Sequence, residues 1–177
     1  EKDSYVAAMK GVLFSFDASM AVVDLSHDIS PQNVAQASYF WQGAIPYYPP
    51  GTIHLGVVGP GVGTERKICV AEGGGQILVC PDNGMLTHWW LGTPGAKAYE
   101  VTHREYWRGT QSATFHGRDI FSPMAGALGA GHLNPEDCGP EIQPVLLDLP
   151  GWTSMEKGWK VAVTSIDHFG NCITSIP

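Results

Sequence analysis

The chain has 177 residues, enough for one domain of ordinary size and the beginning of a second. Its net charge of −7, with no cluster of Lys and Arg, argues against nucleic acid as the main partner, because neutralising phosphates requires clustered cations. Charged residues make up only 15%, which suggests that part of the surface is buried against other subunits.

The four cysteines are scattered along the chain without any Cys-x-x-Cys pair. This spacing predicts neither a zinc site nor a redox motif, and four reduced thiols are typical of a cytoplasmic protein. No apolar run approaches the length of a membrane span, and no signal peptide is visible. We therefore expect a cytoplasmic protein with no membrane partner. Both ends look cut, so we treat the chain as a fragment.

The first half of the chain alternates between patterns typical of helices and of strands. Residues 5–16 carry apolar side chains at helical spacing behind Ser4, which could cap the helix. Residues 21–25 form a short β-branched run, as expected for a buried parallel strand. A helix over 33–47 and a strand over 52–58 follow. This alternation predicts an α/β domain of three layers around a central, mostly parallel sheet.

The next segments continue the same domain. Residues 67–71 and 76–80 are expected to form an antiparallel pair around the glycines at 73–75. A short helix over 85–91, a strand over 98–102 and a helix over 120–128 complete the predicted elements of the domain.

The later sequence suggests a change of domain. We predict an N-terminal α/β domain over 1–135, followed by a linker rich in Pro and Gly over 136–157. Residues 158–177 alternate like strands and are interpreted as the start of a β-rich, incomplete C-terminal domain.

The most informative segment is the run from Gly59 to Arg66, in which three glycines and Pro60 follow a β-rich stretch. Glycines allow the backbone to approach a ligand closely, and the arginine supplies a permanent, forked donor. The spacing matches neither the P-loop nor the dinucleotide-binding fingerprint, so a nucleotide-phosphate site is poorly supported. The run is better interpreted as a substrate loop.

A second polar segment, residues 114–119, places His116 beside Arg118 and Asp119 at the start of a predicted helix. The helix N-terminus adds a positive potential there. A structural role is the more probable interpretation for Arg118, whereas for His116 a structural and a functional role are evenly balanced. The histidine spacing does not predict a metal site, and no Gly-x-Ser-x-Gly elbow indicates a serine nucleophile.

Six motifs, at residues 2–11, 23–29, 60–66, 81–84, 114–121 and 166–171, occur in an order that resembles the S-adenosylmethionine hydroxide adenosyltransferase family, which also contains the fluorinase and chlorinase. Within that family the His-Gly-Arg-Asp sequence at 116–119 is similar to the hydrolase branch, since the halogenases carry tyrosine at the position of His116. The resemblance covers nearly the whole chain.

The resemblance implies that S-adenosylmethionine is the substrate, that no cofactor or metal is needed, and that an Asp, an Arg and a His handle the nucleophile. Arg66 and His116 match two of these residues, but Gly59 stands where the family has the Asp. The resemblance further implies substrate-binding roles, which are carried by Asp3, Asp167, Phe169 and Asn171. It also implies a homotrimer with the active site at the subunit interface.

The expected reaction is hydrolysis of S-adenosylmethionine to adenosine and methionine, by in-line attack of activated water at the ribose C5′. Two alternatives remain open at this stage. Gly59 and Gly117 leave space for a halide, which would make the chain a chlorinase-like halogenase, although His116 argues against this. Loss of the carboxylate at Gly59 could instead leave a catalytically impaired protein that binds S-adenosylmethionine or adenosine.

Overall fold

The computed structural model describes residues 3–60, 66–109, 112 and 114–176. The chain divides into two compact units, residues 1–146 and 147–177, and each is described by itself. In the described part of the chain no helix has both the length and the apolar character needed to cross a membrane.

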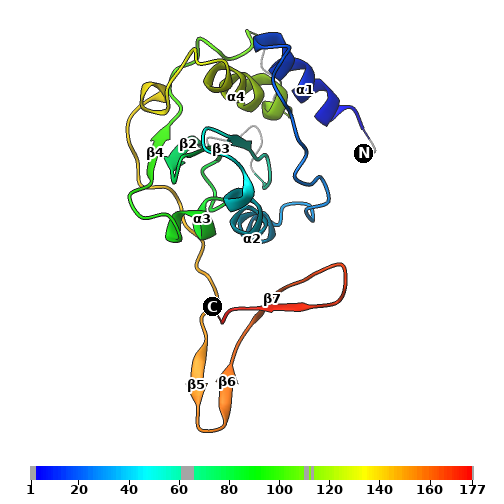
Figure 1. Ribbon diagram of the computed structural model, residues 1–177, viewed down its shortest axis with the longest axis vertical. Helices are drawn as coiled ribbons and strands as arrows, with labels where there is room; N and C mark the ends of the chain where they lie inside the picture. The colour runs from blue at the N-terminus through cyan, green and yellow to red at the C-terminus, as the bar shows by residue number, and fades with distance from the viewer. Residues whose placement is uncertain (1–2, 61–65, 110–111, 113, 177) are drawn as a thin grey trace. The chain divides into compact units, whose positions relative to one another are not determined.

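The first unit is built on a four-stranded sheet with the order β1-β3-β2-β4 (Figure 1). Its strands are β1 (Ile53–Leu55), β2 (Ile68–Gly73), β3 (Gln76–Pro81) and β4 (Lys97–Glu100). β1 pairs with β3 in parallel, whereas β2 is antiparallel to both of its neighbours. An α/β unit is thus confirmed, but the expected mostly parallel sheet is a mixed one.

The mixed character arises from the tight hairpin that joins β2 to β3. Gly73 pairs with Gln76, and the two glycines between them, Gly74 and Gly75, have φ angles of 57° and 77°. Positive φ at both central positions is the requirement of the two-residue turns that best match strand twist. The predicted antiparallel pair is therefore confirmed, and this hairpin is what places an antiparallel strand inside the sheet.

Helices cover both faces of the sheet because successive residues of β2 point to opposite sides. Ile68 and Val70 pack in a core with residues of α1 (Tyr5–Phe16) and α4 (Ser122–Gly129). Figure 1 shows these two helices on the same side of the sheet.

On the opposite face, Cys69 and Ala71 pack with Ala37 and Trp41 of α2 (Val34–Ala44) and with residues of α3 (Thr87–Leu91). Pro46 lies in η1 (Ile45–Tyr47), a 3₁₀ turn that follows α2 directly. The helix expected over 33–47 is thus divided, since proline cannot continue the α-helical hydrogen bonds.

Residues 21–25, expected as a buried parallel strand, form no strand in the structure. Val23 is 66% exposed, and Asp24 forms ion pairs with Lys10, at 2.6 Å, and His27, at 3.0 Å. β-branched residues favour a strand only when a neighbouring strand pairs with their backbone and packs against their side chains. No such pairing is present among the described residues, which is why this prediction is wrong.

The segment expected to begin the linker belongs to the first unit instead. Cys138, at the end of η3 (Pro135–Cys138), is fully buried in the core. Beyond it, the backbone N–H of Ile142 donates to the carbonyl of Ala98 at 2.8 Å, and the N–H of Val145 donates to Asp82 Oδ1 at 2.7 Å. These bonds attach residues 138–145 to the edge of the sheet, so the linker predicted from residue 136 begins too early.

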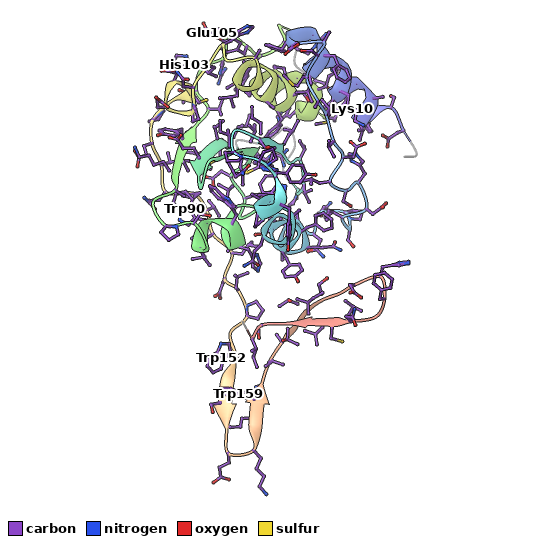
Figure 2. The ribbon with its side chains drawn as sticks, in the orientation of Figure 1. Lys10, Trp90, His103, Glu105, Trp152 and Trp159 are labelled. Carbon is purple, nitrogen blue, oxygen red and sulfur yellow. The ribbon has the colours of Figure 1, made fainter. Side chains whose placement is uncertain are left out.

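The second unit contains two hairpins. β5 (Thr153–Met155) pairs with β6 (Gly158–Lys160), and β7 (Val163–Ile166) pairs with β8 (Cys172–Thr174). The first hairpin lies partly within the predicted linker. Trp152, directly before β5, and Trp159, in β6, contact each other edge to face at 4.8 Å between ring centroids (Figure 2). The β-rich character expected for the end of the chain therefore begins earlier than predicted.

Candidate active site

Gly59 follows β1 at an edge of the sheet where two parallel strands end. Because β1 and β3 are parallel neighbours, the residues after them meet there: Asn83 Nδ2 donates to the carbonyl of Val58 at 2.9 Å. Carboxyl ends of strands are where α/β sheets commonly bind ligands. Gly59 itself has a φ of 123°, and a Cβ there would collide with the Asn83 amide and lie 3.1 Å from Val34 Cγ2.

Arg66 is anchored to the backbone at this edge. Its Nη1 donates to the carbonyl of Pro60 at 2.9 Å and to that of Gly59 at 3.3 Å. The guanidinium carbon lies 5.9 Å from the centroid of the Phe121 ring, within the range of a cation–π contact. Partial burial lowers the pKa of Arg66, although an arginine remains charged at physiological pH.

Two further nitrogens of this guanidinium, Nε and Nη2, are buried and have no hydrogen-bond partner among the residues that the structure describes. Buried donors normally have partners, because an unpaired polar group in the interior is unfavourable. This unpaired edge of the guanidinium is the side that usually holds a carboxylate through two parallel hydrogen bonds.

His116 comes from a later segment of the chain, directly before η2 (Gly117–Phe121), a π-type turn that leads into α4. Such turns are frequent at functional sites. Burial lowers the pKa of His116, the positive charge of Arg66 lowers it further, and Asp119 acts in the opposite direction. The structure therefore brings Arg66 and His116 within electrostatic range of each other, with the imidazole favoured in its neutral form.

Asp119 is not available as a partner for Arg66. Its fully buried carboxylate accepts hydrogen bonds from Arg118 Nε at 2.6 Å, from Arg118 Nη2 at 2.9 Å and from the backbone N–H of Ser112 at 2.8 Å. The bonds from Arg118 are the main reason why the pKa of Asp119 is lowered. The structural role expected for Arg118 agrees with this arrangement.

Asp3 lies at the start of α1, where its Oδ1 accepts a hydrogen bond from the backbone N–H of Tyr5 at 3.1 Å. The expected cap from the side chain of Ser4 is absent. The ring of Tyr5 contacts that of Phe115 edge to face at 4.6 Å, which connects this helix start to the residue before His116. Asp3 therefore belongs to the same unit as Arg66 and His116.

The other three predicted substrate-binding residues lie together in the turn between β7 and β8 of the second unit. Asp167 Oδ1 accepts from the backbone N–H groups of Phe169 and Asn171, at 2.9 and 2.8 Å, and Oδ2 accepts from Asn171 Nδ2 at 2.7 Å. Phe169 is 86% exposed. The Asp and the Asn thus hold a turn that presents an aromatic ring to its surroundings.

Sequence reasoning assigned no role to Asn83, which lies beside Gly59, or to Phe121, whose ring lies beside Arg66. Asn83 could have been found, because it follows the predicted strand 76–80 just as Gly59 follows 52–58. No sequence signal indicated Phe121, whose contact with Arg66 depends on the packing of η2. Among the described residues, no group of three or more His, Cys, Asp or Glu side chains could hold a metal ion.

Residues 1–139 match the model of the SAM hydroxide adenosyltransferase N-terminal domain, where SAM is S-adenosylmethionine. The chain belongs to this family. The resemblance inferred from the six sequence motifs is therefore confirmed.

Several relatives of this chain have been named for their activity. A protein of Thermus thermophilus named (R)-S-adenosyl-L-methionine hydrolase is 41% identical over 99% of this chain and 70% of its own length. One of Salinispora tropica with the same name is 39% identical over 96% of this chain and 66% of its own. A fluorinase of Actinopolyspora mzabensis is 29% identical. The chain spans about two thirds of the length of these relatives.

The fold agrees with the family assignment. The crystal structure of an uncharacterised conserved protein from Thermotoga maritima superposes with a TM-score of 0.92 at 36% identity, covering 99% of this chain and 68% of that one. A conserved hypothetical protein from Thermus thermophilus superposes with a TM-score of 0.77, also at 36% identity.

Proposed function

We propose that the full-length protein hydrolyses S-adenosyl-L-methionine to adenosine and L-methionine. The observation that carries this proposal is the placement of His116 within electrostatic range of Arg66, which is anchored at the carboxyl end of the sheet, in a chain whose relatives at 34 to 41% identity are named (R)-S-adenosyl-L-methionine hydrolase.

The chemistry suits these two side chains. The sulfonium leaves as neutral methionine, so no general acid is required, and the difficult partner is the water. Its oxygen forms the bond to C5′ while the C5′–S bond breaks with its electrons going to sulfur, and the water proton passes to a base. A neutral imidazole can accept this proton, and the guanidinium can hold the oxygen in line.

Gly59 sets the main limit on this proposal. It contributes no carboxylate, and Asp119 is engaged by Arg118, so His116 is left as the base. A lowered pKa makes the imidazole a weaker base, and we therefore expect slow turnover. This same observation favours a second candidate function, in which the protein binds S-adenosylmethionine or adenosine without converting it. The halide-dependent reaction is the third outcome that the experiment must separate.

The remaining parts of the proposal concern the whole molecule. We assign Asp3, Asp167, Phe169 and Asn171 to substrate binding, and we propose a cytoplasmic homotrimer in which the site is completed between subunits. The exposure of Phe169 in its turn, and the low charged fraction of the chain, support a surface that other subunits cover. Helices on both faces of the mixed sheet support a three-layer N-terminal domain.

The experiment is a product assay with the full-length protein and S-adenosylmethionine, with and without chloride, followed by chromatography. Adenosine and methionine that form without chloride support the hydrolase, whereas 5′-chloroadenosine would assign a halogenase. Substrate binding without turnover would assign a binding protein. His116→Asn should abolish turnover, while His103→Asn, at an exposed histidine labelled in Figure 2, should leave it unchanged.

A further inference from the structure

Arg66 carries a positive charge that the described residues do not balance. None of them forms an ion pair with its guanidinium, and the carboxylate of Asp119 is shared by Arg118 at 2.6 Å and Arg108 at 3.6 Å. His116 adds no negative charge, because an imidazole is neutral or cationic. A partly buried cation without an anion is unfavourable, so this position is suited to an external one.

One side of the Arg66 guanidinium donates hydrogen bonds to the backbone, and the other side does not. Nη1 is held by the carbonyls of Gly59 and Pro60, whereas Nε and Nη2 are buried and have no partner in the described part of the chain. Nε and Nη2 lie on one edge of the planar group, with a spacing that matches the two oxygens of a carboxylate. The contact with Phe121 restricts the plane of the guanidinium, so this edge is presented in a fixed direction.

We infer that the Nε/Nη2 edge of Arg66 is a binding site for a small carboxylate anion, held by two parallel hydrogen bonds. Gly59 places no side chain against the guanidinium, which leaves an external carboxylate to supply the missing acceptor oxygens. The inference goes beyond the proposed hydrolysis, because the site binds its anion whether or not S-adenosylmethionine is converted.

The carboxylate could come from two sources, a free anion of the formate type or the carboxylate of an amino-acid ligand. Both present the same planar pair of oxygens. A halide offers a single acceptor centre and cannot pair with both donors in parallel, so we expect chloride to compete weakly.

The test is a titration of the full-length protein with ¹³C-formate at constant ionic strength, with binding followed by NMR. The wild type should bind one formate saturably, and Arg66→Lys should bind it at least about tenfold more weakly, because an ammonium cannot form the bidentate pair. Arg104→Lys is the matched control, since Arg104 also stacks on an aromatic ring, at 5.1 Å from Trp107, but is exposed. It should bind formate as the wild type does.

Competition identifies the source and tests the chemistry. Displacement of formate by L-methionine assigns the site to an amino-acid carboxylate, and its failure assigns it to a free anion; both support the proposal. Absence of saturable binding to the wild type, unchanged binding to Arg66→Lys, or equal competition by chloride would overturn it. If Arg66→Lys fails to fold, a crystal structure of the wild type with formate tests the inference instead. Formate bound at Nε and Nη2 of Arg66 supports it, and formate bound only elsewhere contradicts it.

Discussion

The imidazole of His116 lies within electrostatic range of the guanidinium of Arg66, although the two residues are 50 positions apart in the sequence. Burial lowers the pKa of His116, and the charge of Arg66 lowers it further. Burial and the charge of Arg66 together favour a neutral imidazole, which can accept a proton at a pH where a solvated histidine is partly protonated.

Removing the charge of Arg66 should therefore raise the pKa of His116. In Arg66→Gln we expect the pKa of His116 to shift upward but to stay below that of a solvated histidine, since burial, the larger cause, remains. The measurement is an NMR titration of the His116 ring, with Arg104→Gln as the control. An unchanged pKa in Arg66→Gln would show that the two groups do not interact.

Gly59→Ala should destabilise the protein for two reasons, backbone strain at a φ of 123° and the collision with Asn83. A substitution at Gly95 measures the effect of strain alone, because Gly95 also has a positive φ, of 78°, but has no atom within 4 Å of the Cβ position. We expect Gly95→Ala to cost about 1 kcal/mol from backbone strain and Gly59→Ala clearly more. Urea unfolding of both variants measures the difference, and equal costs would mean that Asn83 moves aside freely.

Supplying a carboxylate at position 59 should increase hydrolysis once space is made for it. We expect Gly59→Asp combined with Asn83→Ala to turn over S-adenosylmethionine at least about tenfold faster than Asn83→Ala alone, because the new carboxylate can orient water and pair with Arg66. The readout is the initial rate of adenosine formation. If the rates are equal, water is held by a different arrangement.

Buried His54 should make the protein less stable in acid. Gln76 Nε2 donates to the carbonyl of Tyr48, so its Oε1 accepts a hydrogen bond at 3.0 Å from His54 Nε2, which carries the proton of the neutral ring. Burial lowers the pKa of His54 below the value of 6.5 for an exposed histidine. The unfolded state thus binds more protons below pH 6.5, and the free energy of unfolding falls as the pH decreases through that range.

The corresponding variant is His54→Phe, which removes this titration. Its free energy of unfolding should depend less steeply on pH, by up to about 1.4 kcal/mol per pH unit, than that of the wild type. The half-buried His88 and His116 also have lowered pKa values, so part of the dependence should remain. Urea unfolding at several pH values measures this pH dependence, and His103→Gln, at an exposed histidine, is the control. An identical pH dependence of the free energy of unfolding in wild type and His54→Phe would refute the role of His54.

Asp119→Asn should cost about 1–3 kcal/mol, because it leaves Arg118 without its charged partner at a fully buried position. The cost is reduced by the exposure of the Arg118 side chain, which is 35%. Lys67→Gln is the comparison, since it breaks the exposed pair with Glu100 and should cost little, because solvent screens a surface ion pair. The denaturation midpoints of the two variants measure these losses of stability. A smaller loss in Asp119→Asn than in Lys67→Gln would contradict a structural role for the pair of Asp119 and Arg118.

Local patterns predicted those elements whose structure depends on neighbouring residues. The hairpin of β2 and β3 followed from two apolar runs around glycines, and α1 from its apolar spacing. Residues 21–25 were predicted wrongly because a strand needs a partner that its own sequence does not specify. Residues 138–145 looked like a linker because bonds to the edge of the sheet leave no periodic pattern in the sequence.

The sequence by itself determined the family, and it predicted Arg66 and His116 as the two side chains that handle the nucleophile, because six ordered motifs carry that information. Only the tertiary structure decided how much room surrounds Gly59 and which donors of Arg66 are free. Asn83 closes the space beside Gly59, and Pro60 occupies one side of the guanidinium while its Nε and Nη2 stay unpaired. These properties depend on contacts between residues distant in the chain and on the direction of individual hydrogen bonds, which are set when the strands and helices pack together.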